Sequence, residues 1–180
     1  MSTKRRPRPR HLRNEKYSRK TAGKTGRKCK MMKSLMKTSD SVVDLILRLT
    51  LAAVFFPHGA QKVFGWFGGY GLSATYGFFT QKMGIPGIFA ALDIAAEFLG
   101  PIGLFFGFLA RGAAFGIFCV MATAVWMVHR HTGFFMNWSG TLPAGKEGFE
   151  FHLLALALCL AVMVRGAGAL SVDRAMGGKK

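Results

Sequence analysis

Residues 112–128, GAAFGIFCVMATAVWMV, form an apolar run without a single charged side chain. A helix on the surface of a soluble protein carries polar side chains along one face at helical period. This run has no such face, and its length is close to the roughly 20 apolar residues that a transmembrane helix requires. It therefore predicts a membrane-spanning helix and argues against the alternative of a soluble bundle of buried helices.

Three further apolar segments flank this run. They are residues 42–56, which extend towards Phe67 through a Pro-His-Gly step, residues 88–109 and residues 149–164. With its flanks included, each segment approaches the length of a membrane span. Residues 41–176 are therefore predicted to form one all-α domain, a bundle of four transmembrane helices embedded in the lipid bilayer.

Basic charge is concentrated ahead of this domain. The chain has 25 Lys and Arg against eight Asp and Glu, and residues 1–40 hold 15 of the basic residues but only two of the acidic ones. Such a segment cannot bury enough apolar surface to offset its ordering entropy, so it is predicted to be a disordered basic tail. The remaining residues carry ten basic against six acidic side chains, which excludes a uniformly basic nucleic-acid-binding domain.

Four roles for the tail stay open. It can bind anionic lipid head groups, fix the membrane topology or bind nucleic acid without specificity. It can also be absent from the mature protein, if synthesis starts at Met31, Met32 or Met36. A standard signal peptide is not indicated, because no small-residue cleavage site follows a short apolar run.

The connections between the segments predict the topology. The link between the second and third spans consists of residues 110–112 only, so these two spans are predicted to form a tight antiparallel hairpin. Arg111 is predicted to fix the inner turn of this hairpin. Four spans place both termini on one side, which carries the tail and the larger share of the basic residues, so the termini are predicted to be cytoplasmic. That side holds Arg111, Arg165, Arg174, Lys179 and Lys180, against Lys62, Lys82, Arg130 and Lys146 on the opposite side.

Ionisable residues inside the spans are the first candidate site. A charge at the bilayer centre costs at least ~2.5 kcal/mol and usually faces a partner inside the bundle. Asp93 and Glu97 lie on one face of the second span, and Arg48 in the first span is the predicted partner of Glu97. Two interpretations stay open: an ion pair that only fixes helix register, or a functional site at which Glu97 binds a proton.

A second candidate site is a polar cluster at the outer membrane surface. It consists of His58, Gln61, Lys62, His129 and Glu150, which the predicted topology brings to one level; His131, Glu147 and His152 lie at the same level. The chain has neither HExxH nor CxxC, so no metal site is predicted. The cluster is interpreted either as a polar cap for the outer loops or as a pocket for the head group of a small ligand such as a quinone.

The cysteines form no motif. Cys119 and Cys159 fall at similar depths on the third and fourth spans, where a redox pair is one hypothesis and two small apolar side chains the other. Their role stays open at this stage.

The sequence also resembles a known family. The run LILRLTLAAVFFPHGAQKVFGWFGGYGL at residues 45–72 is similar to the opening signature of the DoxX family of small membrane proteins. The resemblance continues through GIP at residues 84–86, EFLG at 97–100, the turn at 107–111, His129 followed by GFF at 133–135, and Glu150. It closes with GAGALSVDR and covers about residues 42–174.

The resemblance implies a multi-pass protein of the bacterial inner membrane. The family takes its name from a subunit of a thiosulfate:quinone oxidoreductase, so a membrane subunit or accessory of a quinone-linked oxidoreductase system is the predicted function. The alternatives are an assembly or scaffold protein, and a small-solute or proton carrier that would need to form a homo-oligomer. No flavin, haem or iron–sulfur motif occurs in the chain, so any cofactor is predicted to be the quinone itself or to sit on a redox partner protein.

Overall fold

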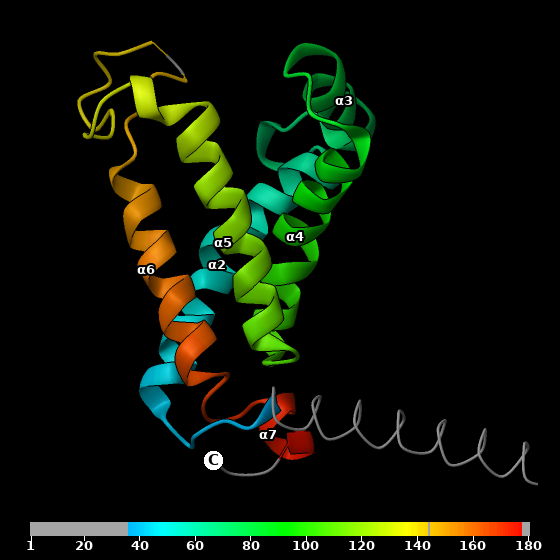
Figure 1. Ribbon diagram of the computed structural model, residues 1–180, viewed down its shortest axis with the longest axis vertical. Helices are drawn as coiled ribbons and strands as arrows, with labels where there is room; N and C mark the ends of the chain where they lie inside the picture. The colour runs from blue at the N-terminus through cyan, green and yellow to red at the C-terminus, as the bar shows by residue number, and fades with distance from the viewer. Residues whose placement is uncertain (1–35, 144, 178–180) are drawn as a thin grey trace, which may run out of the picture.

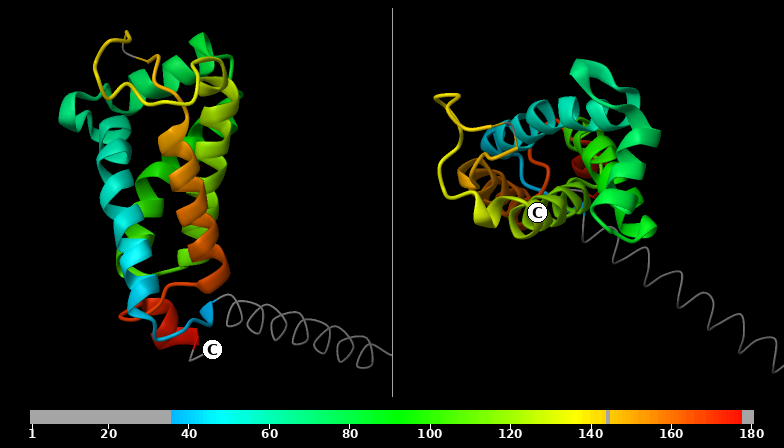
Figure 2. Two further views of the ribbon diagram at one scale, coloured as in Figure 1. Left: turned by 90° about the vertical axis from the view of Figure 1, so that its left-hand side faces the viewer. Right: turned by 90° about the horizontal axis from the view of Figure 1, so that it is seen from above.

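The computed structural model describes residues 36–143 and 145–177, and these form helices and connecting turns without a β-strand. Four long helices pack in the cyclic order α2, α4, α5, α6 (Figures 1 and 2). Their bounds are α2 Val42–Phe64, α4 Gly87–Phe106, α5 Ala110–Met127 and α6 Glu150–Arg165. The short helices are η1 Trp66–Gly68, α3 Gly71–Gly77, the π-helix η2 Phe78–Lys82, η3 His129–His131 and α7 Val172–Gly177.

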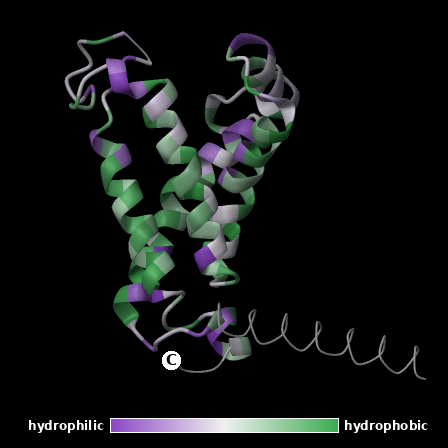
Figure 3. Cartoon of the chain, viewed as in Figure 1, coloured by the Kyte–Doolittle hydropathy of each residue, from purple (hydrophilic) through white to green (hydrophobic). Residues whose placement is uncertain are grey.

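Three of the long helices are long and apolar enough to cross a membrane, namely α2, α4 and α5. The prediction of four spans is therefore supported for three of them. The fourth, α6, has 16 residues, which at about 1.5 Å per residue fall short of a hydrocarbon core about 30 Å thick. Apolar residues dominate the middle of all four helices, as the hydropathy colouring of Figure 3 shows.

The bundle has two different ends. One end, here called the terminal end, holds Met36, the first described residue, and the short helix α7 (Figure 1). The other, the loop end, holds α3, η2 and the connection between α5 and α6. Both ends of the described chain thus lie on one side of the bundle, as the sequence predicted; which side of the membrane this is remains a prediction.

The hairpin between α4 and α5 lies earlier than predicted. Helix α4 ends at Gly107, which has a left-handed backbone with φ of 63°, and Leu109 follows with φ of 48°. Glycine adopts this conformation without steric cost, so the turn forms there. Arg111 consequently lies in the first turn of α5 rather than in the connection.

The predicted tail boundary at residue 40 is also corrected. Residues 1–35 lie outside the described part of the chain, so the disorder predicted for them is untested. Met36 and Thr38, however, are buried against the terminal end, and the Thr38 hydroxyl accepts a hydrogen bond of 2.7 Å from the amide of Gly168. This contact is between residues far apart in the sequence, which local composition cannot reveal.

Helices α2 and α4 are in close backbone contact at Gly59. A Cβ atom at this position would lie 2.2 Å from the carbonyl oxygen of Glu97, so only glycine fits between the two backbones. Around this crossing, Leu51 and Phe55 of α2 pack with Leu104 of α4 and Ile117 of α5 in the buried core. The contact at Gly59 sets the register in which α2 and α4 present their charged side chains.

Candidate functional site

The ion pair predicted between Arg48 and Glu97 does not form. The fully buried Arg48 guanidinium instead donates to four carbonyl oxygens at 2.5–3.1 Å. Two belong to Leu104 and Phe105 at the end of α4, and two belong to Ala169 and Leu170 after α6. Arg48 therefore joins the C-terminal segment to the bundle at the terminal end.

The cation that faces Glu97 is Lys62. Its Nζ lies 2.8 Å from Oε1 of Glu97 and 2.7 Å from Oδ2 of Asp93, and so bridges two carboxylates on one face of α4. Antiparallel packing explains the exchange: because Gly59 lies opposite Glu97, Lys62 reaches the carboxylates, whereas Arg48 lies about three turns away on α2. Glu97 is 5% exposed, and Lys62 and Asp93 are half-buried.

A cavity of about 390 Å³ lies beside this bridge at the loop end. Its polar wall contains Lys62 and Glu97 together with His58, His129, Glu147 and His152; its apolar wall contains Phe55, Met121, Met136 and Phe151. Two buried polar atoms of these residues, Oε2 of Glu97 and Nδ1 of His152, have no hydrogen-bond partner. Such groups are normally paired, and the two residues that carry these atoms both line the cavity.

Two of the histidines in the cavity wall contact each other. The rings of His129, the first residue of η3, and His152, in the first turn of α6, have centroids 4.3 Å apart and are tilted by 41°. Nδ1 of His129 lies 2.7 Å from the carbonyl oxygen of Glu147, which fixes the orientation of that ring. Hydrogen bonds from the amides of Glu147 itself and of Gly145 lower the pKa of the exposed Glu147 carboxyl, so a negative charge lies near His129.

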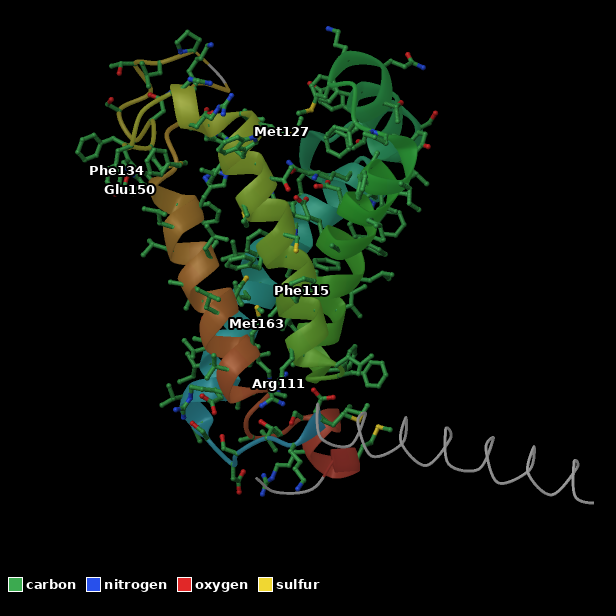
Figure 4. The ribbon with its side chains drawn as sticks, viewed as in Figure 1. Arg111, Phe115, Met127, Phe134, Glu150 and Met163 are labelled. Atoms are coloured by element: carbon green, nitrogen blue, oxygen red, sulfur yellow. The ribbon has the colours of Figure 1, made fainter. Side chains whose placement is uncertain are left out.

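The structure divides the predicted polar cluster. His58, Lys62 and His129 line the cavity, whereas Gln61 and Glu150 do not. Gln61 donates from Nε2 to the carbonyl of Phe67 and so holds the turn after α2. Glu150 accepts hydrogen bonds from the amide of Met136 and from Nε1 of Trp138, and Figure 4 shows it at the head of α6 beneath the connecting loop.

Arg111 ties three segments together at the terminal end. It donates from Nε to the carbonyl of Met163 at 2.9 Å, from one terminal nitrogen to the carbonyl of Lys37 at 2.9 Å, and from the other to Val164 at 3.4 Å. Figure 4 shows Arg111 and Met163 at this end. The predicted role in the hairpin turn is therefore replaced by a link between α5 and α6.

The two cysteines of the spans do not pair with each other. Cys119 and Cys159 are both free thiols; Cys119 is exposed on α5 and Cys159 is buried in the core. Within the described residues, no group of three or more His, Cys, Asp or Glu side chains is arranged to hold a metal ion.

Some residues of the cavity escaped the sequence analysis. Phe55, Met121, Met136 and Phe151 line it, but an apolar side chain in an apolar span gives no signal that distinguishes a cavity wall from a core position. His152 and Glu147 gave a signal, since they were placed at the same membrane level as His129. Their contact with the cavity depends on the path of the loop between α5 and α6.

Part of the chain matches a known protein family. The DoxX family model matches residues 43–130, which run from α2 into η3. The protein of Escherichia coli (strain K12) named Inner membrane protein YqjF is 28% identical over 144 residues, which cover 80% of this chain and 99% of that protein. No solved structure matches. The chain therefore contains a region, from α2 to η3, that matches the DoxX family, and it is similar along most of its length to an inner-membrane protein.

Proposed function

We propose that this protein binds a lipid-soluble quinone or quinol in the cavity at the loop end, as a membrane subunit or accessory of a quinone-linked oxidoreductase system. The name of the Escherichia coli relative supports a location in the bacterial inner membrane. The observation that carries the proposal is the pair of buried, unpartnered atoms, Oε2 of Glu97 and Nδ1 of His152, in one partly apolar cavity.

The chemistry of these two atoms suits a quinol. One hydroxyl group of the quinol donates a hydrogen bond to the carboxylate oxygen of Glu97. The second hydroxyl group donates a hydrogen bond to the ring nitrogen Nδ1 of His152 in one tautomer, or accepts one from it in the other. The apolar wall of Phe55, Met121 and Phe151 accommodates the ring. A volume of about 390 Å³ lies in the range usual for small-molecule sites.

The oxidised form needs donors instead. A quinone carbonyl accepts from Lys62 or His58, which both line the cavity. Lys62 already serves two carboxylates, so a carbonyl must share its ammonium group with them. We therefore expect the site to favour quinol over quinone. In this proposal the chain binds the quinone, and a partner protein exchanges electrons with it.

The test is a calorimetric titration of the purified protein with decylubiquinol. A hydrogen bond to a charged carboxylate contributes about 1.5 kcal/mol or more, so Glu97→Gln should weaken quinol binding about tenfold. Decylubiquinone should be affected less. Glu150→Gln is the matched control, because this carboxylate lies outside the cavity, and it should leave both affinities within about twofold of the wild-type values.

Three outcomes would overturn the proposal. Absence of quinol binding to the wild-type protein would favour a scaffold role. Equal losses in Glu97→Gln and Glu150→Gln would mean that the cavity is not the site. Proton flux into proteoliposomes that disappears in Glu97→Gln, without quinol binding, would favour a carrier. Size-exclusion profiles of the variants distinguish lost binding from lost folding.

A further inference from the structure

A second, larger hollow lies between α4 and α5 on the outside of the bundle. It is a groove of about 610 Å³ whose walls are largely apolar. From α4 and the turn before it come Pro86, Phe89, Leu92, Asp93 and Ala96; from α5 come Phe115, Gly116, Cys119, Thr123 and Met127. Figure 4 labels Phe115 and Met127 at two levels of α5, and the groove runs between these levels.

The groove has a closed end and an open end. At Gly116 a Cβ atom would lie 3.2 Å from Cβ of Ala96, so small residues let α4 and α5 touch there. Towards the loop end the two helices diverge (Figure 1), and Phe89 and Met127 line the groove. Phe89 and Phe115 are more than half exposed, and both lie on helices built to cross a membrane. The groove therefore faces hydrocarbon.

One ion pair connects the groove to the cavity. Asp93 lines the groove, and its Oδ2 lies 2.7 Å from Nζ of Lys62. Lys62 lines the cavity together with Glu97. The cavity and the groove thus lie on either side of this ion pair, and a molecule whose head group lies against Lys62 and Glu97 would reach the groove by passing Asp93 between α4 and α5.

We infer that the groove between α4 and α5 holds the hydrocarbon chain of the ligand whose head group occupies the cavity. The ligand is then an amphiphile that enters from the bilayer rather than from water, and its chain adds to the affinity. This inference rests on the proposed function, since it names the chained members of the quinone class as the ligands. In water, the binding free energy of a hydrocarbon chain grows with the apolar area that leaves water. In a membrane the chain leaves lipid instead, so its contribution to binding is the difference between its packing in the groove and its packing among lipid tails.

Cys119 provides a direct reporter, because it is an exposed thiol in the groove. In a Cys29→Ser, Cys159→Ser background it is the remaining cysteine of the chain. The experiment measures its alkylation rate by N-ethylmaleimide in detergent, with decylubiquinone or with the analogue in which a methyl group replaces the decyl chain. We expect decylubiquinone to slow alkylation at least fivefold and the methyl analogue to leave the rate unchanged, although both bind.

A groove-filling variant gives an independent readout. Thr123→Trp places an indole in the groove, and it should weaken decylubiquinone binding at least tenfold while the methyl analogue binds as before. Leu154→Trp is the matched control, because Leu154 is exposed on α6 and lies outside the groove. It should change neither affinity.

The outcomes separate this inference from the proposed function. If both quinones bind and Glu97→Gln weakens decylubiquinol binding, but Cys119 stays reactive and Thr123→Trp leaves decylubiquinone binding unchanged, the cavity is the site and the groove inference is wrong. If neither quinone binds, both are wrong. Equal protection of Cys119 by decanol, which lacks the head group, also overturns the inference, since it would show general occupancy by any apolar chain.

Discussion

Nζ of Lys62 and Oε1 of Glu97 lie 2.8 Å apart, so a cation near the end of one membrane-spanning helix neutralises a carboxylate inside the next. The pair forms one turn after Gly59, where the backbones of α2 and α4 touch. Close contact and charge pairing thus occur at the same crossing. Only one of the two Glu97 oxygens accepts from Lys62, and the other is buried without a hydrogen-bond partner.

Removal of the cation should destabilise the protein strongly. Lys62→Met leaves Asp93 and Glu97 as two carboxylates without their shared partner, and breaking a buried pair from one side typically costs about 3 kcal/mol or more. We expect an apparent melting temperature in detergent several degrees below that of the wild-type protein. The control is Lys82→Met, which removes an exposed lysine at the same end of the bundle.

The same experiment has a rescue arm. Adding Asp93→Asn and Glu97→Gln to Lys62→Met removes the unpaired charges, and should restore part of the lost stability. If the triple variant is as unstable as Lys62→Met alone, the loss comes from packing of the lysine stem and not from the carboxylates.

Gly59→Ala should separate α2 from α4. The added methyl group would meet the Glu97 carbonyl at 2.2 Å, and overpacking of this kind typically costs about 1–3 kcal/mol. Gly112→Ala is the matched control, because nothing lies within 4 Å of its Cβ position. There alanine should be neutral or stabilising by up to about 1 kcal/mol through its helix propensity. Thermal unfolding of both variants checks the prediction, and equal melting temperatures would contradict it.

Arg48→Lys should loosen the terminal end while keeping the charge. A lysine ammonium has three N–H donors and cannot span the four carbonyls that the planar guanidinium serves, so at least one of them loses its donor. We expect faster proteolysis after α6 in Arg48→Lys than in the wild-type protein. Arg130→Lys, an exposed position at the loop end, serves as the control. Unchanged cleavage would mean that other contacts hold this segment.

Asp173 gives a pH-dependent prediction. Its carboxylate accepts hydrogen bonds from the amides of Leu109 and Ala110, yet burial raises its pKa above the usual range. An acid whose folded pKa lies above its unfolded pKa favours folding most at low pH, and this contribution disappears as pH rises from the unfolded to the folded value. Above about pH 4, stability should therefore decline more for the wild-type protein than for Asp173→Asn. Parallel melting-temperature profiles would contradict this.

The orientation of the membrane helices is the last prediction. The excess of basic residues at the terminal end places that end in the cytoplasm. Green fluorescent protein fused after Lys180 should therefore fluoresce, and alkaline phosphatase fused at the same point should be inactive. The opposite pair of results would invert the topology.

The sequence predicted the helices better than it predicted their pairing. Apolar runs located α2, α4, α5 and α6 because burial in lipid leaves a local signature. The choice of Arg48 as partner for Glu97 was wrong, because depth along a span does not define the register between two helices. That register depends on the contact between Gly59 and Glu97, which involves residues far apart in the sequence. Lys62 and Glu97 were both identified as candidate residues, but in separate sites.

The Arg48 contacts also have a consequence for biosynthesis. Arg48 lies in α2, whereas two of its four acceptors, Ala169 and Leu170, are synthesised 121 and 122 residues later. Until they emerge from the ribosome, the nascent α2 carries a guanidinium that lacks half of its native acceptors, in a membrane where an unpaired charge is costly. The terminal end can close only after these two residues have been synthesised.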